Sequence, residues 1–307
     1  MFISLRFNQG LSGAAGIVIA RAASRDMYTG KELTKFIAML ALVNGAAPIL
    51  APLLGGIVLN FASWRFVFVI LFAIGIVMLI SVLFTLPETL PVGDRMQGGL
   101  LETVKTFNLL LKDRVFIGIA LSQAFASMSM FAYIAGSPFV LQNIYQVTPF
   151  TYSIIFAVNG LGIIIAAQLT GKLAFKMDET HLLKWGVTTS CFGGVLLIIS
   201  VLFSLPLFVL LFSLFLVVSS VGIVNTTSFS LGMQRHDNMA GSASAFLGIL
   251  PFAGGGLVSP FVGIAGDYTA VPMGVIIFIT STMALLVYHI LVRHKRHPLT
   301  RDRSSAV

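Results

Sequence analysis

Long apolar runs separated by short polar connections dominate the chain. Nine of them approach or exceed the 20 or so residues that a helix needs to cross the hydrocarbon of a bilayer. These runs cover residues 2–20, 36–61, 66–86, 115–141, 150–169, 182–203, 207–231, 243–264 and 272–292. The apolar/polar alternation of membrane β-barrel strands is absent from them. The pattern therefore predicts an all-α integral membrane protein with nine transmembrane helices.

Composition supports solvation by lipid. Of the 307 residues, 57% are hydrophobic and 10% are charged, whereas a soluble domain has about 25% charged residues. The net charge is +8, and the basic residues lie mainly between the apolar runs. This position indicates a topology signal and no nucleic-acid partner. The single cysteine, Cys191, excludes an intramolecular disulfide and a multi-cysteine metal site. We expect no cofactor and no metal.

The basic residues predict the orientation. All of the 19 Lys and Arg residues except Arg6 and Arg65 lie in alternate connections or in the C-terminal tail, and such a bias marks the cytoplasmic side. The tail is therefore predicted in the cytoplasm. An odd number of helices then leaves the amino terminus outside. This arrangement is expected of a chain that lacks three leading helices.

The run lengths also predict the domain organisation. Residues 1–86 form a partial three-helix bundle, 87–114 a cytoplasmic linker, 115–292 a six-helix bundle and 293–307 a basic cytoplasmic tail. Apolar residues recur at helical spacing in the linker, which predicts an amphipathic helix on the membrane surface. These residues are Leu100, Leu101, Val104, Phe107, Leu110 and Leu111.

Polar residues inside the first run suggest a wet surface. Arg6 precedes Arg21 by 15 residues, or about 22 Å along a helix, which puts Arg6 in the outer half of the membrane. An Arg at the centre of the membrane costs roughly 2.5–3.5 kcal/mol on insertion scales, and intramembrane charges usually face a hydrated cavity. Asn8 and Gln9 lie close by. Snorkelling of Arg6 to the outer surface is the open alternative.

The second run contains Pro48, Pro52, Gly55 and Gly56. Proline bends a helix, and glycine allows another backbone to approach closely. These residues predict a kinked helix with one smooth face, which any membrane bundle could use. By themselves they name no function.

Three segments together resemble a known family. RFNQGLSG (residues 6–13) resembles motif B, on the fourth helix of the major facilitator superfamily, and APLLGG (51–56) resembles motif C, the antiporter motif of the fifth helix. Ala51 stands where glycine is usual in motif C. With RAASRDMY (21–28) and the pair Trp64–Arg65, the chain looks like the bicyclomycin-resistance (Bcr/CflA) branch of drug:proton antiporters. The nine runs would then be helices 4–12 of twelve.

The resemblance implies roles for particular residues. In this superfamily helices one, four, seven and ten line a central cavity. The implied cavity residues are Arg6, Asn8, Gln9, Gln123, Met128, Met130, Tyr133, Asn225 and Thr226. Ordinary helix packing is the open alternative for each Met and Tyr. Pro48, Pro52, Gly55 and Gly56 correspond to the antiporter motif. Asp26, beside Arg25, resembles the acid that latches the cytoplasmic gate.

The resemblance also implies a function and a location. The function is that of a proton-coupled antiporter that exports small amphipathic drugs by alternating access, and the location is the bilayer of the bacterial inner (plasma) membrane, where the protein would be a monomer. None of the 11 acidic residues lies in the middle of a predicted span. We therefore expect the coupling carboxylate on an absent first helix, and no coupled efflux by this chain alone. An amino-acid or metabolite exporter of the same superfamily, or an inactive transporter fragment, is the alternative. No catalytic cluster can be found among the acids and the five histidines, which argues against an enzyme.

Overall fold

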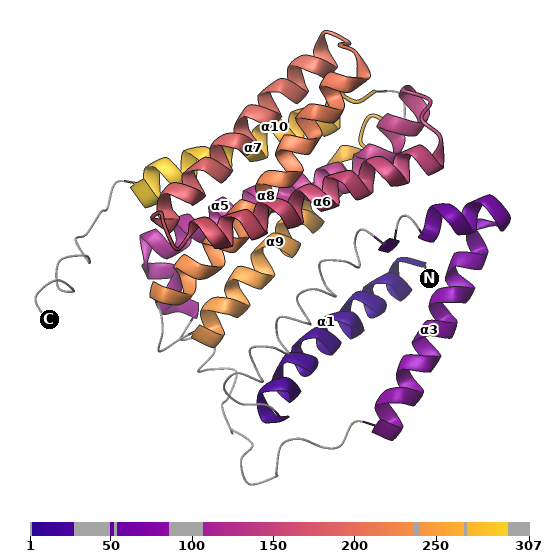
Figure 1. Cartoon of the computed structure of the whole chain (residues 1–307), viewed down its shortest axis with the longest axis horizontal. Helices are drawn as coiled ribbons and strands as arrows, with labels where there is room; N and C mark the ends of the chain where they lie inside the picture. Colours follow the sequence, from indigo (N-terminus) through magenta and orange to yellow (C-terminus); the bar gives the residue numbers. More distant parts are fainter. Residues whose placement is uncertain are drawn as a thin grey trace, which may run out of the picture. The chain divides into compact units, whose positions relative to one another are not determined.

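The computed structural model of the chain is helical throughout the part that it describes, which is residues 2–27, 50–51, 54–85, 107–235, 240–266 and 269–293. Its helices are α1 (Phe2–Met27), α3 (Trp64–Thr85), α5 (Arg114–Phe139), α6 (Pro149–Leu173), α7 (Glu179–Leu202), α8 (Leu207–Arg235), α9 (Ala240–Val262) and α10 (Val271–Val287) (Figure 1). Two π-helical turns, η2 (Val140–Ile144) and η5 (Tyr288–Arg293), extend α5 and α10.

Seven of the described helices are long and apolar enough to cross a membrane. They correspond to the last seven of the nine predicted runs, so the prediction of an all-α membrane bundle is confirmed. The first predicted run forms α1, which is less apolar and is not among the seven. The second run, 36–61, is helical at 50–51 and over 54–61, and its remaining residues lie outside the part that the structure describes.

Short polar side chains fix where several helices begin. Asp113, Thr148 and Asp178 precede α5, α6 and α7, and each accepts a hydrogen bond of 2.7–3.2 Å from a backbone N–H in the first turn that follows. These N-caps satisfy donors that have no partner within the helix. Pro149 occupies the first position of α6, where its missing N–H costs nothing.

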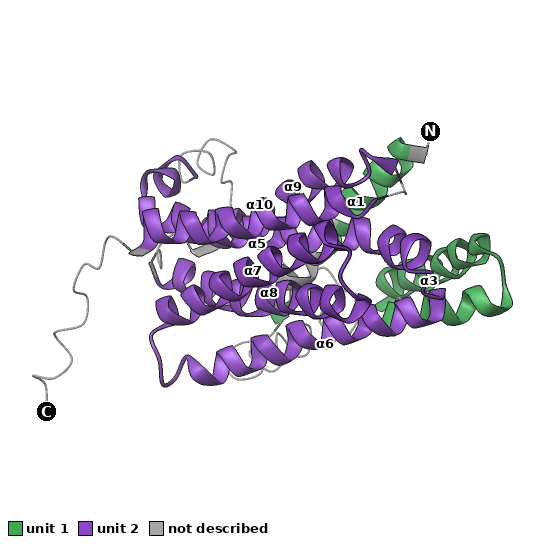
Figure 2. Cartoon of the chain, turned by 90° about the horizontal axis from the view of Figure 1, so that it is seen from above, with its two compact units in different colours: residues 1–98 green, residues 99–307 purple. Residues whose placement is uncertain are grey.

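The chain divides into two compact units, residues 1–98 and 99–307 (Figure 2). The division falls inside the predicted linker 87–114. Residues 86–106 lie outside the described part, as do the predicted helix positions before Phe107. From Phe107 the chain is helical, and Leu110 is fully buried in a cluster with Phe116.

The C-terminal unit is a repeat of two three-helix groups. α5 packs against α9 and α10, and α8 packs in the same way against α6 and α7. The remaining principal contacts join α5 to α8 and α7 to α10. Exchanging α5–α7 with α8–α10 leaves this pattern unchanged, as in a pseudo-two-fold repeat.

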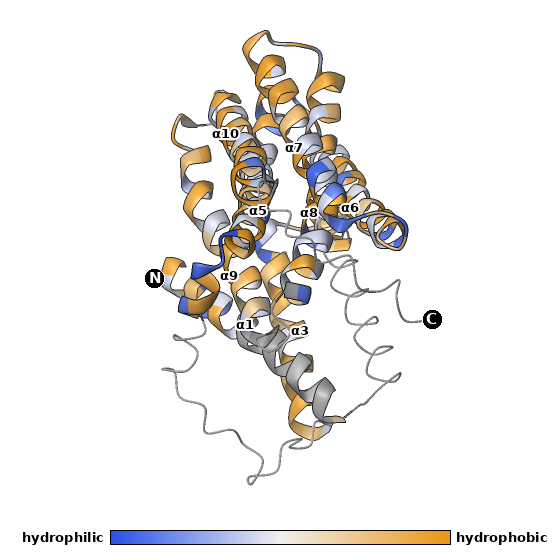
Figure 3. Cartoon of the chain, turned by 90° about the vertical axis from the view of Figure 1, so that its left-hand side faces the viewer, coloured by the Kyte–Doolittle hydropathy of each residue, from blue (hydrophilic) through white to orange (hydrophobic). Residues whose placement is uncertain are grey.

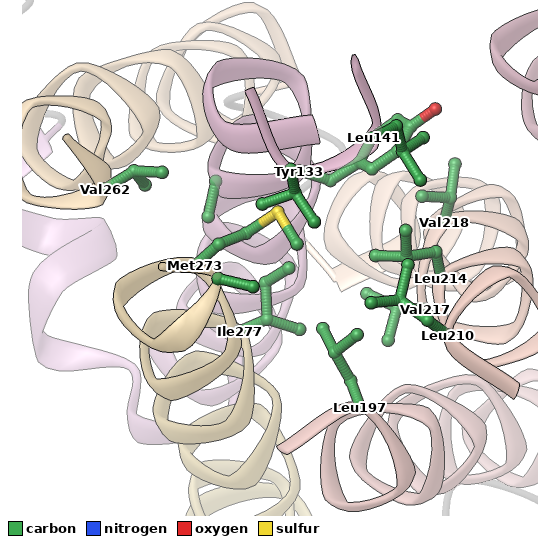
Figure 4. Packing of buried hydrophobic residues seen from close by; sticks show 13 residues of the cluster. Tyr133, Leu141, Leu197, Leu210, Leu214, Val217, Val218, Val262, Met273 and Ile277 are labelled. Atoms are coloured by element: carbon green, nitrogen blue, oxygen red, sulfur yellow. The ribbon is translucent and has the colours of Figure 1, made fainter. Parts of the chain in front are cut away.

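Apolar side chains fill the interior and also cover the outside. The largest buried cluster draws Tyr133, Leu197, Leu214, Val262 and Met273 from five helices (Figure 4). The exposed face of α6 is an apolar stripe at helical spacing, formed by Ile154, Val158, Leu161, Ile165 and Leu169. In Figure 3, where the ribbon is coloured by hydropathy, hydrophobic residues predominate along the described helices. A helix that is apolar on both faces is buried in protein on one side and in lipid on the other.

Candidate functional site

Arg6, the charged residue predicted inside the membrane, contacts side chains of α1 and α3 in its own unit. Nη1 of Arg6 donates a 2.9 Å hydrogen bond to Oε1 of Gln9, one turn further along α1. The guanidinium carbon also lies over the ring of Phe68 in α3, 5.1 Å from the ring centroid. A cation–π contact of this kind contributes about 0.5–1 kcal/mol at an exposed site.

Phe68 places Arg6 near one end of α3. It lies one turn from Trp64, whose ring is covered by the guanidinium of Arg65 at 4.8 Å. Trp is enriched where a helix leaves the hydrocarbon. Arg6 is therefore about one turn inside the end of α3 that the charge pattern predicts to be outside the cell. Arg6 remains exposed within unit 1 despite its contact with Phe68.

The rest of the motif-B segment is open within this unit. Asn8 and Gln9 are exposed. A Cβ atom added at Gly10, Gly13 or Gly16 would meet no atom within 4 Å. This face of α1 can accept a close neighbour, because small residues let helix backbones approach. The cavity role of Arg6, Asn8 and Gln9 stays a prediction.

Only part of the antiporter motif and of the gate can be located. Gly56 is buried, whereas a Cβ at Gly55 would meet nothing within 4 Å. Pro48 and Pro52 lie outside the described residues. Arg25 and Asp26 belong to the last turn of α1, but their side chains are not described. The roles of all these residues stay predictions.

In the C-terminal unit two predicted cavity residues have unpaired oxygens. Gln123 on α5 is only 6% exposed, and its Oε1 has no hydrogen-bond partner among the described residues. Asn225 on α8 is half-buried, and its Oδ1 is buried and lacks a partner in the same way. Leaving a buried acceptor unpaired costs about 1–3 kcal/mol. Unpaired buried groups are rare, and each needs an explanation, such as a functional role or a bound water or ion. Four serine hydroxyls of the same unit also lack a partner, those of Ser190, Ser200, Ser219 and Ser228.

Tyr133 is placed differently from these amides. It is 1% exposed, and its hydroxyl accepts a 2.9 Å hydrogen bond from Nδ2 of Asn159 on α6. Its ring stacks on that of Phe156, with the ring centroids 5.6 Å apart. Within this unit Tyr133 joins α5 to α6 through these two contacts, and its cavity role stays a prediction. Met130 is half-buried on α5.

The structure also reveals interhelical polar contacts that the sequence did not point to. Oγ of Ser129 on α5 lies 2.7 Å from Oγ1 of Thr280 on α10. At the start of α7, Glu179 accepts hydrogen bonds from Ser230 at 2.9 Å and from Gln234 at 3.3 Å, both near the end of α8. No sequence signal pairs segments about 50 or 150 residues apart, because the pairing depends on how the helices pack.

The described residues contain no cluster of three or more His, Cys, Asp or Glu that could hold a metal ion. The polar groups inside the C-terminal unit are amides and hydroxyls. Such groups bind and orient a solute through hydrogen bonds. The fold and these groups define the class of the protein, a multi-pass helical membrane protein with amide and hydroxyl groups among the buried residues that the structure describes.

Comparison with known sequences identifies the family. The sequence profile of the Major Facilitator Superfamily matches residues 1–260. The chain belongs to this superfamily, whose members are transporters and not enzymes, as the motifs predicted.

Named relatives agree with the predicted branch. The chain is 40% identical over 295 residues to the uncharacterized MFS-type transporter YdgK of Bacillus subtilis, covering 95% of this chain and 73% of the relative. It is 26% identical over 290 residues to a bicyclomycin resistance protein homolog of Haemophilus influenzae, covering 94% and 73% of the two chains. It is also 26% identical over 252 residues to the multidrug transporter MdfA of Yersinia pestis, covering 81% of this chain and 61% of MdfA.

A solved structure shares the fold. It is a bacterial homolog of the human lysosomal transporter Spinster in an inward-facing, unoccupied conformation, with a TM-score of 0.62 over 91% of this chain and 75% of that one. The two sequences are 15% identical, so this likeness concerns the fold alone.

Proposed function

We propose that this protein belongs to a proton-coupled drug-efflux system of the bacterial inner membrane, which exports small amphipathic toxic compounds by alternating access. The observation that carries the proposal is the similarity to a bicyclomycin resistance protein homolog and to the multidrug transporter MdfA over most of the chain. The motif-B and motif-C segments of the first 56 residues support it.

The chemistry of the C-terminal unit supports a bulky, largely apolar substrate. Its buried polar groups are neutral, and half-buried Met128, Met130 and Phe131 lie on the same helix as Gln123. Thioether and aromatic side chains repack around ligands of different shape, and few fixed hydrogen bonds are needed. This combination suits a transporter that accepts several drugs.

Arg6 is the residue that we propose as the link to protons. An Arg side chain near a carboxyl group lowers the pKa of that group and favours its charged form. No acidic residue of the sequence lies in the middle of a predicted span. In this proposal the antiport uses the proton gradient and no cofactor, and residues 1–307 alone bind the drug without coupling it to protons.

The second candidate is an exporter of amino acids or metabolites. A zwitterionic substrate needs partners for both of its charges, and Arg6 supplies only one of them. An inactive transporter fragment is the third reading, and it predicts no specific binding. We further propose a monomer with a cytoplasmic C-terminus.

Competition binding separates these candidates. Residues 1–307, purified in lipid nanodiscs, would be titrated with ethidium, a fluorescent amphipathic cation, and challenged with a panel of drugs and amino acids. Displacement by drugs but not by amino acids is expected. Displacement by amino acids alone would favour the second candidate, and absence of saturable binding would favour the third.

Efflux tests the coupling. Cells expressing residues 1–307 would be loaded with ethidium, and its loss would be followed with and without a protonophore. We expect no protonophore-sensitive extrusion, because these residues contain no acid at depth. Extrusion that the protonophore abolishes would contradict this part of the proposal.

A further inference from the structure

Gln123 lies on α5 and Asn225 on α8, and each has an unpaired amide oxygen among the described residues. The helices are in contact, and a contact near one end fixes their alignment. A Cβ atom at Gly232 of α8 would lie 3.5 Å from Cε2 of Phe116 in α5. Phe116 is near the start of α5 and Gly232 is near the end of α8, so the two helices run in opposite directions here.

Counting along both helices brings the amides together. Gln123 follows Phe116 by seven residues, and Asn225 precedes Gly232 by seven. Seven residues are close to two helical turns, so each step returns to the same face and advances by about 10 Å. The two amides are therefore at one level on facing surfaces. A further step of seven residues leads to Met130 on α5 and Val218 on α8.

Neither amide oxygen is used to hold the helices together. If the pair joined α5 to α8, each oxygen would accept a hydrogen bond, as the hydroxyl of Tyr133 does from Asn159. Instead Oε1 of Gln123 and Oδ1 of Asn225 have no partner among the described residues. The terminal torsions of Gln and Asn are broad, so rotation can turn an oxygen toward the exposed side of Asn225.

We propose that Gln123 and Asn225 form a binding subsite that accepts hydrogen bonds from N–H or O–H groups of the transported compound. This inference rests on the proposed drug-binding function and specifies the chemistry of one of its contacts. A compound that carries such donors would satisfy oxygens that have no partner among the described residues. The subsite therefore discriminates between drugs of similar size and charge by their donor groups.

Two aromatic cations test this chemistry. Ethidium carries aromatic amino groups that donate hydrogen bonds, whereas tetraphenylphosphonium has no donor. Binding of each would be measured on residues 1–307 in nanodiscs, for wild type, Gln123→Leu, Asn225→Leu and the control Gln168→Leu. Gln168 is an exposed glutamine on the neighbouring helix α6, so the control makes the same chemical change away from the subsite.

The expected result is selective. Gln123→Leu and Asn225→Leu each weaken ethidium binding about tenfold, the effect of one lost hydrogen bond, and change tetraphenylphosphonium binding less than about twofold. The control changes neither. Because leucine removes an unpaired oxygen, the melting temperature of Gln123→Leu should not fall. An equal loss of both cations, or no loss of either, would overturn the subsite.

A double variant in which the two amide residues are exchanged serves as a control for misfolding. Gln123→Asn combined with Asn225→Gln keeps both amides and the total side-chain volume, and should keep the preference for ethidium that the leucine variants lose. A swapped variant that loses the preference would also overturn the subsite. If wild type binds both cations but the preference is insensitive to every variant, only the subsite fails. If wild type binds neither cation, the drug-binding function fails together with it.

Discussion

The contact between α6 and α8 gives a sharp test of the packing, because at Gly222 it is made by backbone. A Cβ added there would overlap the carbonyl oxygen of Ile163 and would lie 3.1 Å from the backbone N of Ala167. Backbone atoms cannot rotate away as a flexible side chain can. Gly222→Ala therefore forces the two helices apart.

Two opposing effects determine how much Gly222→Ala changes the free energy of unfolding. Overpacking of a well-packed interior costs about 1–3 kcal/mol, while replacing glycine by alanine in a helix interior gains about 1 kcal/mol. The matched control is Gly248→Ala on α9, where a Cβ would meet nothing within 4 Å and only the gain applies. The two variants should therefore differ by the overpacking cost of about 2 kcal/mol. For a unit of this size that is about 4–8 °C in melting temperature.

The chain supplies its own probe for this measurement. Cys191 is the only cysteine, and it is half-buried on α7 with its Sγ 3.8 Å from Oγ1 of Thr282. A thiol-reactive fluorogenic dye will therefore report unfolding as this residue becomes accessible. Gly248→Ala should melt at or above the wild-type temperature, and Gly222→Ala several degrees below the control. Equal melting temperatures for the two variants would refute the close approach of α6 and α8.

Further outcomes can be predicted from single contacts. Tyr133→Phe leaves the buried amide of Asn159 without its partner and should lower the free energy of unfolding by about 1 kcal/mol in thermal melts; an unchanged value would mean that the hydrogen bond is absent. Glu179→Ala removes the acceptor of Ser230 at the end of α8 and should cost about 1 kcal/mol, discounted for partial exposure, with faster hydrogen exchange confined to the adjoining ends of α7 and α8. Ethidium affinity should change by less than about threefold between pH 6 and 8, because no acidic residue and no histidine of the sequence lies in the middle of a predicted span; a tenfold change would reveal a titrating group in the site.

The extent of the helices could be predicted from hydropathy, a property that is summed along the chain. Hydropathy over about 20 residues gave the seven spans that the structure describes as candidates, to within a few residues at most ends. Several ends lay slightly outside the apolar runs, because N-caps such as Asp113 and Asp178 belong to the polar connections. The motif segments pointed to the correct superfamily for a similar reason, since each is contiguous.

Tertiary structure alone decided which polar and small residues meet. Gly222 and Gly248 are both glycines inside apolar helices, yet one touches a backbone and the other faces open space. Tyr133 and Gln123 were both assigned to a cavity, but Tyr133 is paired with Asn159 and Gln123 has an unpaired oxygen. Hydropathy is a local sum that tells how each segment partitions into lipid. The rotation and alignment of helices about 100 residues apart in sequence depend on side-chain packing between them, which no single segment contains.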